Sequence, residues 1–332
     1  MSEFPLFRIL IVALIDVLKC LNPIELFDLS QLSKTSTALI KLVGTKNFHL
    51  SMSEDCIAIN HKYHFVIVES FDPNFYNQLG TRVFHSIEAQ VLEPKGRENI
   101  IKIVWRHRTK GVINTMLHLV NLFGCPIRSY YKSRNNPGFT SDYSKHYRTI
   151  MSTMMKTQGG IRRLEIPPNC FEHSDNSWTM ENVKGVEEFI SADYSSIVFN
   201  FLQNLKLLDT DSYFIGMEHL LVAAKSCEAI LLRYSELTWE NLNEFMKAWK
   251  SGEFSNLQCL RVYSKQLNKE EGQILGFTGG ELERDARALD KWRMIRGLNF
   301  QMAHGVEIQR DDGVRGMMGL HCNSTMFVLN TL

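Results

Sequence analysis

An apolar run near the amino terminus constrains the fold of this chain more than any other feature. Between Ile9 and Leu21, eleven of thirteen residues are apolar, and only Asp16 and Lys19 interrupt them. A helix that is apolar nearly all round must be buried on more than one side. A segment of about forty residues is too small to bury such a helix by itself. The cover must come from the rest of the chain or from a partner protein, and the residues alone leave both open.

Capping signals divide this amino-terminal segment into three helices. Asn22 can cap a helix that begins at Pro23, with Glu25 as the third residue of a capping box. Ser33 can cap a further helix, which Gly44 ends. We therefore expect one helix before Asn22, one from Pro23 and one after Ser33.

The middle of the chain, residues 45–160, is predicted to mix strands and helices. Short, β-branched and partly alternating segments begin at Phe48 and are separated by turn-forming residues. They are HLSMS, CIAIN, HFVIVES, RVFHSIEAQVL and NIIKIVW. Gly111 to Phe123 then has its apolar residues on one face, which predicts a helix.

A weak repeat runs through the second half. ILLRYSELTWENLNEFMKAW and CLRVYSKQLNKEEGQIL match at an offset of 29, which pairs Tyr234 with Tyr263. Each copy predicts a short strand followed by a helix, and LKLLDTDSYFIGMEHLL and RRLEI fit the scheme more loosely. A period of about 24 to 29 residues with strand then helix is typical of leucine-rich repeats, whose strands line one curved face.

Two more elements are expected near the carboxyl end. A charged helix is predicted around Glu281 to Arg296, and the Asp-Gly pair in VEIQRDDGVRGMMGL predicts a β-hairpin. The fold class is therefore α+β, with a helical segment 1–44, a mixed region 45–160, and a leucine-rich-repeat-like α/β array with a C-terminal β-hairpin in 161–332.

Composition and motifs favour binding over catalysis. The 332 residues are 44% hydrophobic with a net charge of +1, as in globular proteins. No glycine-rich phosphate loop, nucleophile elbow or zincin motif occurs. Cys56, His61 and His64 lack a fourth metal ligand, and the sequence DTD at 209–211 favours a polar turn after a strand over a calcium loop. We expect no enzyme, no cofactor and no metal.

The cysteines and apolar runs predict an intracellular protein, cytoplasmic and/or nuclear. Seven scattered cysteines form no C-x-x-C pair, which is typical of a reducing compartment. No run reaches the ~20 apolar residues of a membrane-spanning helix. Glu3 precedes the amino-terminal run, unlike the basic start of a signal peptide. A secreted, signal-anchored binder is the alternative, and cleavage near about residue 20 would reveal it.

One stretch is strongly basic. Residues 102–163 contain twelve Lys or Arg and one acid, Asp142, with four interleaved tyrosines. Three interpretations remain open: a face that pairs with the acidic remainder of the chain, a grip on an acidic or phosphorylated substrate, or a nucleic-acid surface. The arginines to test are Arg128, Arg134, Arg148, Arg162 and Arg163.

The amino-terminal segment resembles the F-box. The positions that match its pattern in order and spacing are Ile9, Leu14, Val17, Leu18, Leu21, Pro23, Leu26, Leu29, Leu32, Ser33 and Lys34. Leu10 stands where the F-box pattern has proline, and the usual bulky residue of its third helix is absent. The run AAKSCEAILLRYSELTWENLNEFMKAWKSGEFSNLQCLRVYS and the DDG hairpin resemble the F-box-associated region of a nematode-expanded F-box family.

This resemblance implies a ubiquitin-ligase adaptor. The F-box would bind a Skp-type adaptor and, through it, a cullin scaffold, while the C-terminal region would hold a protein substrate. The apolar positions expected to divide between this contact and the internal core are Ile9, Leu10, Leu14, Leu18, Leu21, Pro23, Leu26 and Leu29. We expect Ile9, Leu10, Leu18, Leu21 and Pro23 to face the adaptor. Tyr234 and Tyr263 are candidate substrate contacts on the strand face, or aromatics at the edge of the core.

Overall fold

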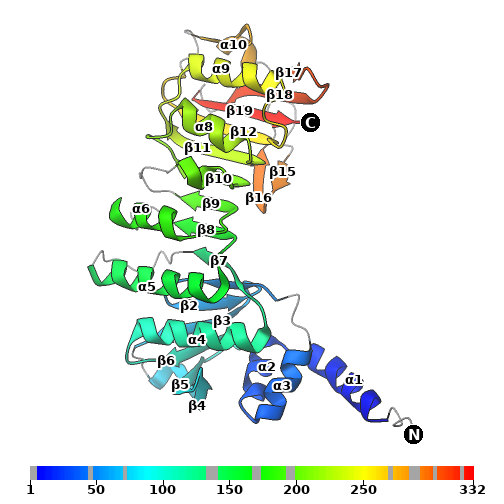
Figure 1. Ribbon diagram of the computed structural model, residues 1–332, viewed down its shortest axis with the longest axis vertical. Helices are drawn as coiled ribbons and strands as arrows, with labels where there is room; N and C mark the ends of the chain where they lie inside the picture. The colour runs from blue at the N-terminus through cyan, green and yellow to red at the C-terminus, as the bar shows by residue number, and fades with distance from the viewer. Residues whose placement is uncertain are drawn as a thin grey trace. The chain divides into compact units, whose positions relative to one another are not determined.

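The chain forms two compact units, Met1–Ile161 and Arg162–Leu332, which we call unit 1 and unit 2. Figure 1 shows the computed structural model, which is a mixture of helices and strands. It describes residues 6–43, 48–69, 73–131, 141–166, 173–191, 199–267, 272–283, 292–301, 305–321 and 325–332.

Unit 1 begins with helices at the predicted boundaries. They are α1 (Leu6–Lys19), α2 (Pro23–Ser30) and α3 (Lys34–Leu42). The side chain of Asn22 accepts the N–H groups of Ile24 and Glu25, while the Glu25 carboxylate accepts the N–H of Asn22. This is the predicted capping box. The Ser33 hydroxyl accepts the N–H of Ser36 and caps α3, also as predicted.

A mixed sheet follows in unit 1, with the strand order β7-β1-β2-β3-β6-β5-β4. The pairs β1·β7 and β3·β6 are parallel, and the other neighbours are antiparallel. The strands are β1 (Leu50–Met52), β2 (Cys56–Ile59), β3 (Tyr63–Val68), β4 (Tyr76–Phe84), β5 (Ile87–Pro94), β6 (Ile100–Val104) and β7 (Ile127–Tyr131). A single 3-10 turn, Pro73–Phe75, precedes β4.

Two longer helices complete unit 1. They are α4 (Arg108–Phe123) and α5 (Ser141–Gln158). The predicted helix Gly111–Phe123 is confirmed and begins three residues earlier, at Arg108. It ends at Gly124, whose left-handed φ of +62° is the usual glycine stop.

Phe27 fixes α2 to the sheet of unit 1. Its fully buried ring stacks on Phe84 of β4, with 5.3 Å between centroids, and lies edge-on to Phe65 of β3, also at 5.3 Å. The ring of His118, from α4, contacts both Phe27 and Phe84 at 5.7 and 5.6 Å. The rest of unit 1 therefore covers α2, which answers part of the question that the apolar sequence raised.

The burial of His118 makes unit 1 sensitive to acid. Burial, together with the charges of His85 and Lys41, lowers the pKa of His118 to about 4. Below pH ~6.5 the unfolded chain binds a proton that the folded chain still excludes, so stability falls as the pH falls from about 6.5 to about 4.

We expect His118→Asn to flatten this dependence. Between about pH 7 and pH 5 the native chain should lose about 2 kcal/mol of unfolding free energy through His118, a loss that the variant lacks. Urea unfolding at both pH values measures it. His64 and His146 have pKa values lowered by burial as well, so the variant keeps their smaller contributions. An equal pH dependence in both proteins would contradict the assignment to His118.

Unit 2 is built from parallel strands that alternate with helices. The strand order is β17-β18-β19-β12-β11-β10-β9-β8, and the strands from β8 to β12 are all parallel. The alternating elements are β8 (Arg163–Ile166), α6 (His173–Asn182), β9 (Glu188–Ser191), α7 (Phe199–Leu202), β10 (Leu207–Asp211), α8 (Met217–Ala224), β11 (Ala229–Ser235), α9 (Trp239–Lys250) and β12 (Cys259–Ser264). Parallel neighbours need such crossover connections.

The remaining elements of unit 2 are short strands and one short helix. They are β13 (Gln273–Ile274), β14 (Phe277–Thr278), α10 (Gly279–Leu282), β15 (Trp292–Ile295), β16 (Leu298–Gln301), β17 (Val306–Gln309), β18 (Arg315–His321) and β19 (Met326–Thr331). β12, β19, β18 and β17 pair antiparallel in that order. The hairpin predicted from the Asp-Gly pair is confirmed as β17 and β18.

The predicted order of a strand followed by a helix is confirmed in the first copy of the repeat, and the helix of the second copy is wrong in part. In the first copy β11 is followed by α9, whose predicted inner face is buried: Leu242, Phe245, Met246 and Trp249. In the second copy β12 forms, but Ile274 lies in a hairpin instead of a helix. Leu275 and Gly276 both have positive φ, the backbone of a two-residue hairpin turn.

The predicted charged helix around Glu281 to Arg296 is wrong at both of its ends. Helix α10 ends at Leu282, and Trp292–Ile295 is a strand paired with β16. Residues 284–291 lie outside the described part. Arg296 and Gly297 have positive φ and close another two-residue turn, a signal that charge patterning does not detect.

The sequence DTD at 209–211 lies inside β10 and not in a turn. Asp209 and Asp211 are buried, and the Arg233 guanidinium of β11 pairs with both. Burial raises the pKa of Asp209 to about 6 although Arg233 opposes the shift. Buried carboxylates need charged partners. The pairing with Arg233 therefore explains how Asp209 and Asp211 can both be buried in one strand.

Candidate functional site

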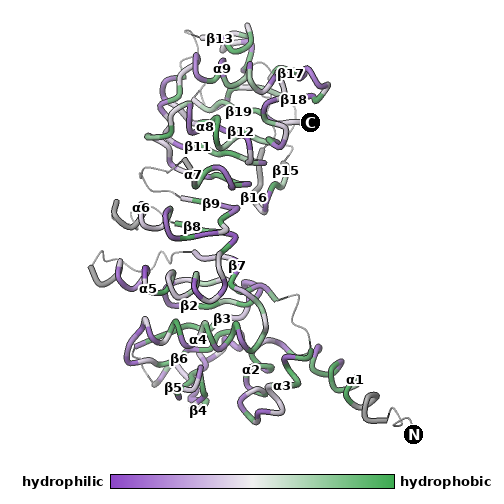
Figure 2. The backbone as a smooth tube through the Cα atoms, in the orientation of Figure 1, coloured by the Kyte–Doolittle hydropathy of each residue, from purple (hydrophilic) through white to green (hydrophobic). Residues whose placement is uncertain are grey.

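Helix α1 presents apolar side chains to solvent. Ile11, Val12, Leu14 and Val17 are exposed, and Val12 and Val17 retain 58% and 60% of their surface. In Figure 1, α1 extends away from α2 and α3, and Figure 2 colours most of its described length as hydrophobic. Burial of each such side chain is worth roughly 1.5 to 3 kcal/mol, so this surface favours a partner.

The described residues place the predicted adaptor contacts in two groups. Leu14 is exposed, and Leu21 and Leu29 are half-buried. Leu18, Pro23 and Leu26 are buried within unit 1. The side chains of Ile9 and Leu10 lie outside the described part. We expected Leu18 and Pro23 to face the adaptor. Because both are buried in the free chain, they can affect adaptor binding only indirectly, by holding α1 and α2 in place.

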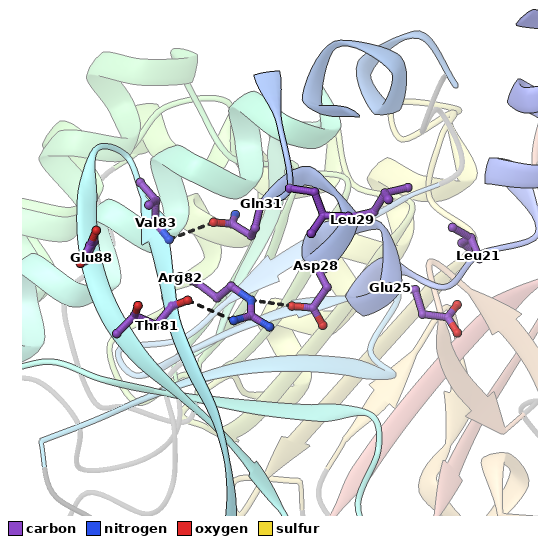
Figure 3. A pocket seen from close by; sticks show the side chains of 10 residues that line it. Leu21, Glu25, Asp28, Leu29, Gln31, Thr81, Arg82, Val83 and Glu88 are labelled. Atoms are coloured by element: carbon purple, nitrogen blue, oxygen red, sulfur yellow. Dashed lines mark hydrogen bonds and ion pairs between the residues drawn. The ribbon is translucent and has the colours of Figure 1, made fainter. Parts of the chain in front are cut away.

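A groove lies between α2 and the β4–β5 hairpin (Figure 3). Its volume is about 730 Å³, and its lining comprises Leu21, Glu25, Asp28, Leu29, Gln31, Leu32, Thr81, Arg82, Val83 and Glu88. Leu32 and Val83 are exposed, whereas Leu21 and Leu29 are half-buried in its wall. The groove therefore brings apolar side chains of the helical segment together with Val83 of the sheet, beside charged side chains.

Two polar contacts hold the walls of the groove in place. Arg82 Nε donates to Asp28 Oδ1 at 2.9 Å, and the N–H of Val83 donates to Gln31 Oε1 at 2.9 Å. Both contacts join α2 or the residue after it to β4. The position of α2 is thus tied to the folded sheet, and sequence reasoning did not detect this dependence.

The Cys56 thiol of unit 1 is kept protonated by its surroundings. Burial raises the pKa of the Cys56 thiol to about 12, with Asp55 adding to the shift, so the reactive thiolate is scarce at neutral pH. Cys56 Sγ lies 3.7 Å from His64 Nδ1.

Within the described ranges, no group of three His, Cys, Asp or Glu side chains is arranged to hold a metal ion. No helix in those ranges has the length and hydropathy to cross a membrane.

The candidate substrate tyrosines meet at one pocket in unit 2. Tyr234 and Tyr263 lie near the carboxyl ends of β11 and β12, and both line a pocket of about 260 Å³. Tyr213, just after β10, lines it too and stacks on Tyr234. Sequence reasoning missed Tyr213, although it lies in the loosely matching repeat segment LKLLDTDSYFIGMEHLL. In open parallel sheets, ligands bind outside the carboxyl ends of the strands.

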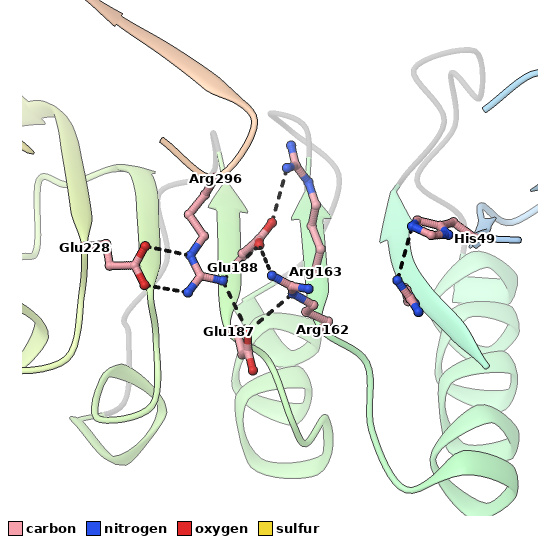
Figure 4. Close-up of polar contacts among 8 residues, drawn as sticks. His49, Arg162, Arg163, Glu187, Glu188, Glu228 and Arg296 are labelled. Atoms are coloured by element: carbon pink, nitrogen blue, oxygen red, sulfur yellow. Dashed lines mark hydrogen bonds and ion pairs between the residues drawn. The ribbon is translucent and has the colours of Figure 1, made fainter. Parts of the chain in front are cut away.

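The candidate arginines of unit 2 pair with acids of their own unit. Arg162 contacts Glu187 at 3.3 Å and Glu188 at 3.4 Å, and Arg163 contacts Glu188 at 3.3 Å (Figure 4). Arg163 also lies 3.6 Å from Glu165. For these two arginines, the contacts favour the interpretation in which the basic stretch pairs with acids of the same chain.

The candidate arginines of unit 1 are placed differently. Arg128 Nη1 lies 3.2 Å from His49 Nε2. Arg148 is half-buried on α5. Arg134 lies outside the described residues. The contact of the five arginines with a substrate therefore stays a prediction.

Arg296 joins the β15–β16 turn to the same acids. It donates to both carboxylate oxygens of Glu228, at 3.0 and 2.6 Å, and also lies 3.4 Å from Glu187 and 3.5 Å from Glu188. The hydrogen bonds from Arg296 lower the pKa of Glu228. Ile295 beside it is buried against Leu207, Ala229 and Cys259. The β15–β16 hairpin is thus held against the sheet of unit 2 by these ion pairs and by the packing of Ile295.

We expect Arg296→Ala to lower the free energy of unfolding by about 1 to 3 kcal/mol, because charge-assisted bidentate bonds are lost and Glu228 keeps its charge. Urea unfolding measures the loss. Arg315→Ala is the matched control, since its pair with Glu307 is exposed and should be worth at most about 1 kcal/mol. Equal effects of the two substitutions would contradict the role of Arg296.

Comparison with known proteins identifies part of the parallel array of unit 2. Residues 197–262 match the family model described as F-box associated. This F-box-associated region contains α7 to α9, β10, β11 and most of β12, and includes Tyr213 and Tyr234 of the pocket. No curated protein matches the chain, and no solved structure does.

Proposed function

We propose that this protein is the substrate-recognition subunit of an SCF-type, cullin-RING ubiquitin ligase. In this proposal α1 to α3 form an F-box that binds a Skp-type adaptor, which links the chain to a cullin scaffold. Unit 2 holds a protein substrate, and the chain itself performs no catalysis. It works inside the cell, in the cytoplasm, the nucleus or both, where such ligases act.

One observation carries the proposal. A three-helix segment with F-box spacing exposes Ile11, Val12, Leu14 and Val17, in a chain that also contains an F-box-associated region. The unit 1 sheet covers α2 through Phe27 but leaves these α1 side chains in solvent. A helix with such a face gains by docking on another protein, as amphipathic helices do in grooves.

The substrate role rests on the array in unit 2. Successive parallel strands with intervening helices support a leucine-rich-repeat-like arrangement, in which one strand face and one row of strand ends are presented together. The tyrosine pocket lies at these strand ends. We propose that substrates are bound there, with Tyr234 and Tyr263 among the contacts.

Co-purification tests the adaptor role. The full chain is co-expressed with a Skp-type adaptor, and the complex is measured by size-exclusion chromatography at low and high salt. The proposal expects a one-to-one complex that survives high salt, because an apolar interface responds weakly to ionic strength. Two separate peaks at both salt concentrations would contradict it.

The same preparation tests the alternative of a nucleic-acid-binding protein that uses residues 102–163. Phosphate contacts lose affinity steeply with salt, so labelled single-stranded DNA and RNA should then bind tightly at low salt only. The intramolecular pairs of Arg162 and Arg163 do not favour that alternative.

A further inference from the structure

Tyr234 is held in a backbone conformation that bulky residues rarely adopt. Its φ is +53°, in the left-handed region. The pairing of β11 with β12 shifts between Leu232 and Ser235, so that two residues of β11 oppose one of β12. Such bulges re-aim side chains next to binding sites, and backbone strain of this kind persists at ligand clamps.

The bulge leaves the ring of Tyr234 half exposed and parallel to that of Tyr213. The two centroids are 5.6 Å apart and the ring planes differ by 4°. Tyr213 and Tyr234 retain 46% and 50% of their surface, and Tyr263 lies in the same pocket with its other side against Met326 and Val328. The pocket therefore offers flat aromatic surface to a ligand.

Hydrogen bonds within the rim hold this arrangement. The Ser235 hydroxyl accepts the N–H of Leu237 at 3.1 Å. The Ser264 hydroxyl donates to the Leu237 carbonyl at 2.8 Å and accepts the N–H of Gln266 at 3.1 Å. Both serine hydroxyls are thus used inside the rim, which leaves the aromatic rings as the main recognition surface.

Charge and size narrow the ligand class. The rim carries one acid, Glu236, and one base, Lys265, so its formal charge is zero. The Glu236 carboxylate already accepts a hydrogen bond from Gln266 at 2.9 Å. A cation in the pocket would meet both Glu236 and Lys265, whose opposite charges cancel, so the lining offers it no net attraction. The volume of about 260 Å³ is below the roughly 300 to 1,000 Å³ of small-molecule sites, and suits one or two side chains.

We propose that this pocket binds a proline-containing segment of the protein substrate in the polyproline II conformation. Proline supplies a neutral, compact apolar ring, and its segment is pre-organised, so less conformational entropy is lost on binding. Backbone carbonyls in this conformation lack internal partners and remain available as hydrogen-bond acceptors. This inference rests on the proposed function, because it names the class of substrate segment that unit 2 would bind.

Fluorescence polarisation on the full chain tests the inference without any adaptor. The probe is a fluorescein-labelled polyproline peptide, compared with matched peptides in which alanine, phenylalanine, arginine or trimethyllysine replaces the prolines. The polyproline probe should bind at least tenfold more tightly than each of the others. Tyr234→Ala and Tyr213→Ala should each weaken it about tenfold, a usual loss when an aromatic anchor is truncated.

Two further variants separate recognition from folding. Tyr234→Gly removes the ring but suits the left-handed backbone, so it should lose binding without a fall in Tm. Val314→Ala, at an exposed apolar position in the β17–β18 turn, should bind like the native chain.

Tighter binding of the arginine or trimethyllysine peptide would show that the pocket prefers a cationic ligand to proline, and would overturn the inference. Equal binding of all peptides, or native binding by Tyr234→Ala, would overturn it as well. Because the assay contains no adaptor, such a failure leaves the adaptor role standing. Loss of the adaptor complex would, in turn, leave this peptide result unchanged.

Discussion

Val17→Asp is expected to abolish the complex with a Skp-type adaptor while the chain stays folded. Val17 keeps 60% of its surface in the free chain, so the substitution disturbs no internal packing. In the complex the carboxylate would be desolvated without a partner, at a cost of about 3 to 5 kcal/mol. This corresponds to a loss of affinity of ~100-fold or more. Titration calorimetry measures it, with thermal unfolding as the check on folding.

Two substitutions on the same helix make this prediction specific. Asp16→Ala removes an exposed polar side chain that pairs with Lys19 on α1, and should bind within about twofold of the native chain. Leu18→Asp places a charge at a side chain that is 3% exposed, so it should lower Tm and reduce binding indirectly. If Val17→Asp bound the adaptor with native affinity, the exposed face of α1 would not be part of the interface.

Phe27→Ala is expected to destabilise unit 1 by about 3 to 5 kcal/mol, the usual effect of deleting a buried aromatic ring. The ring is fully buried and contacts Phe65, Phe84 and His118 from two strands and α4. Its loss leaves a cavity where the helical segment meets the sheet. Because Phe27 attaches α2 to β3 and β4, the variant should also weaken adaptor binding. Urea unfolding gives the free energy of unfolding.

Phe75→Ala is the matched control, because that ring is 65% exposed. It should change the free energy of unfolding by less than about 0.5 kcal/mol. Similar losses in the two variants would mean that Phe27 is not the contact that unites the helices with the sheet.

The helical segment could be predicted closely because its signals are local. The capping box of Asn22 and Glu25 and the cap at Ser33 involve neighbours in sequence, so the residues alone indicate where each helix begins. The side on which α1 is covered depends on residues distant in sequence. For that reason Leu18 was expected at the interface but lies in the core.

The misses in unit 2 have a similar physical cause. Leu275-Gly276 and Arg296-Gly297 form two-residue turns in which a non-glycine residue adopts positive φ, so helical spacing and charge were misleading guides. Helix α5 was not predicted, although the buried Tyr147, Ile150, Met151 and Met154 follow helical spacing. Tyr213 joins Tyr234 only through the parallel pairing of β10 with β11, which local patterns do not specify.

Hydrogen exchange of the full chain, with and without a Skp-type adaptor, tests the central claim most directly. The account predicts that the adaptor slows exchange across α1 and around Leu29 to Leu32, where apolar side chains are now exposed or line the groove. Exchange in unit 2 should stay the same. Unchanged exchange in α1, together with protection of residues 102–163 or of unit 2, would contradict the account.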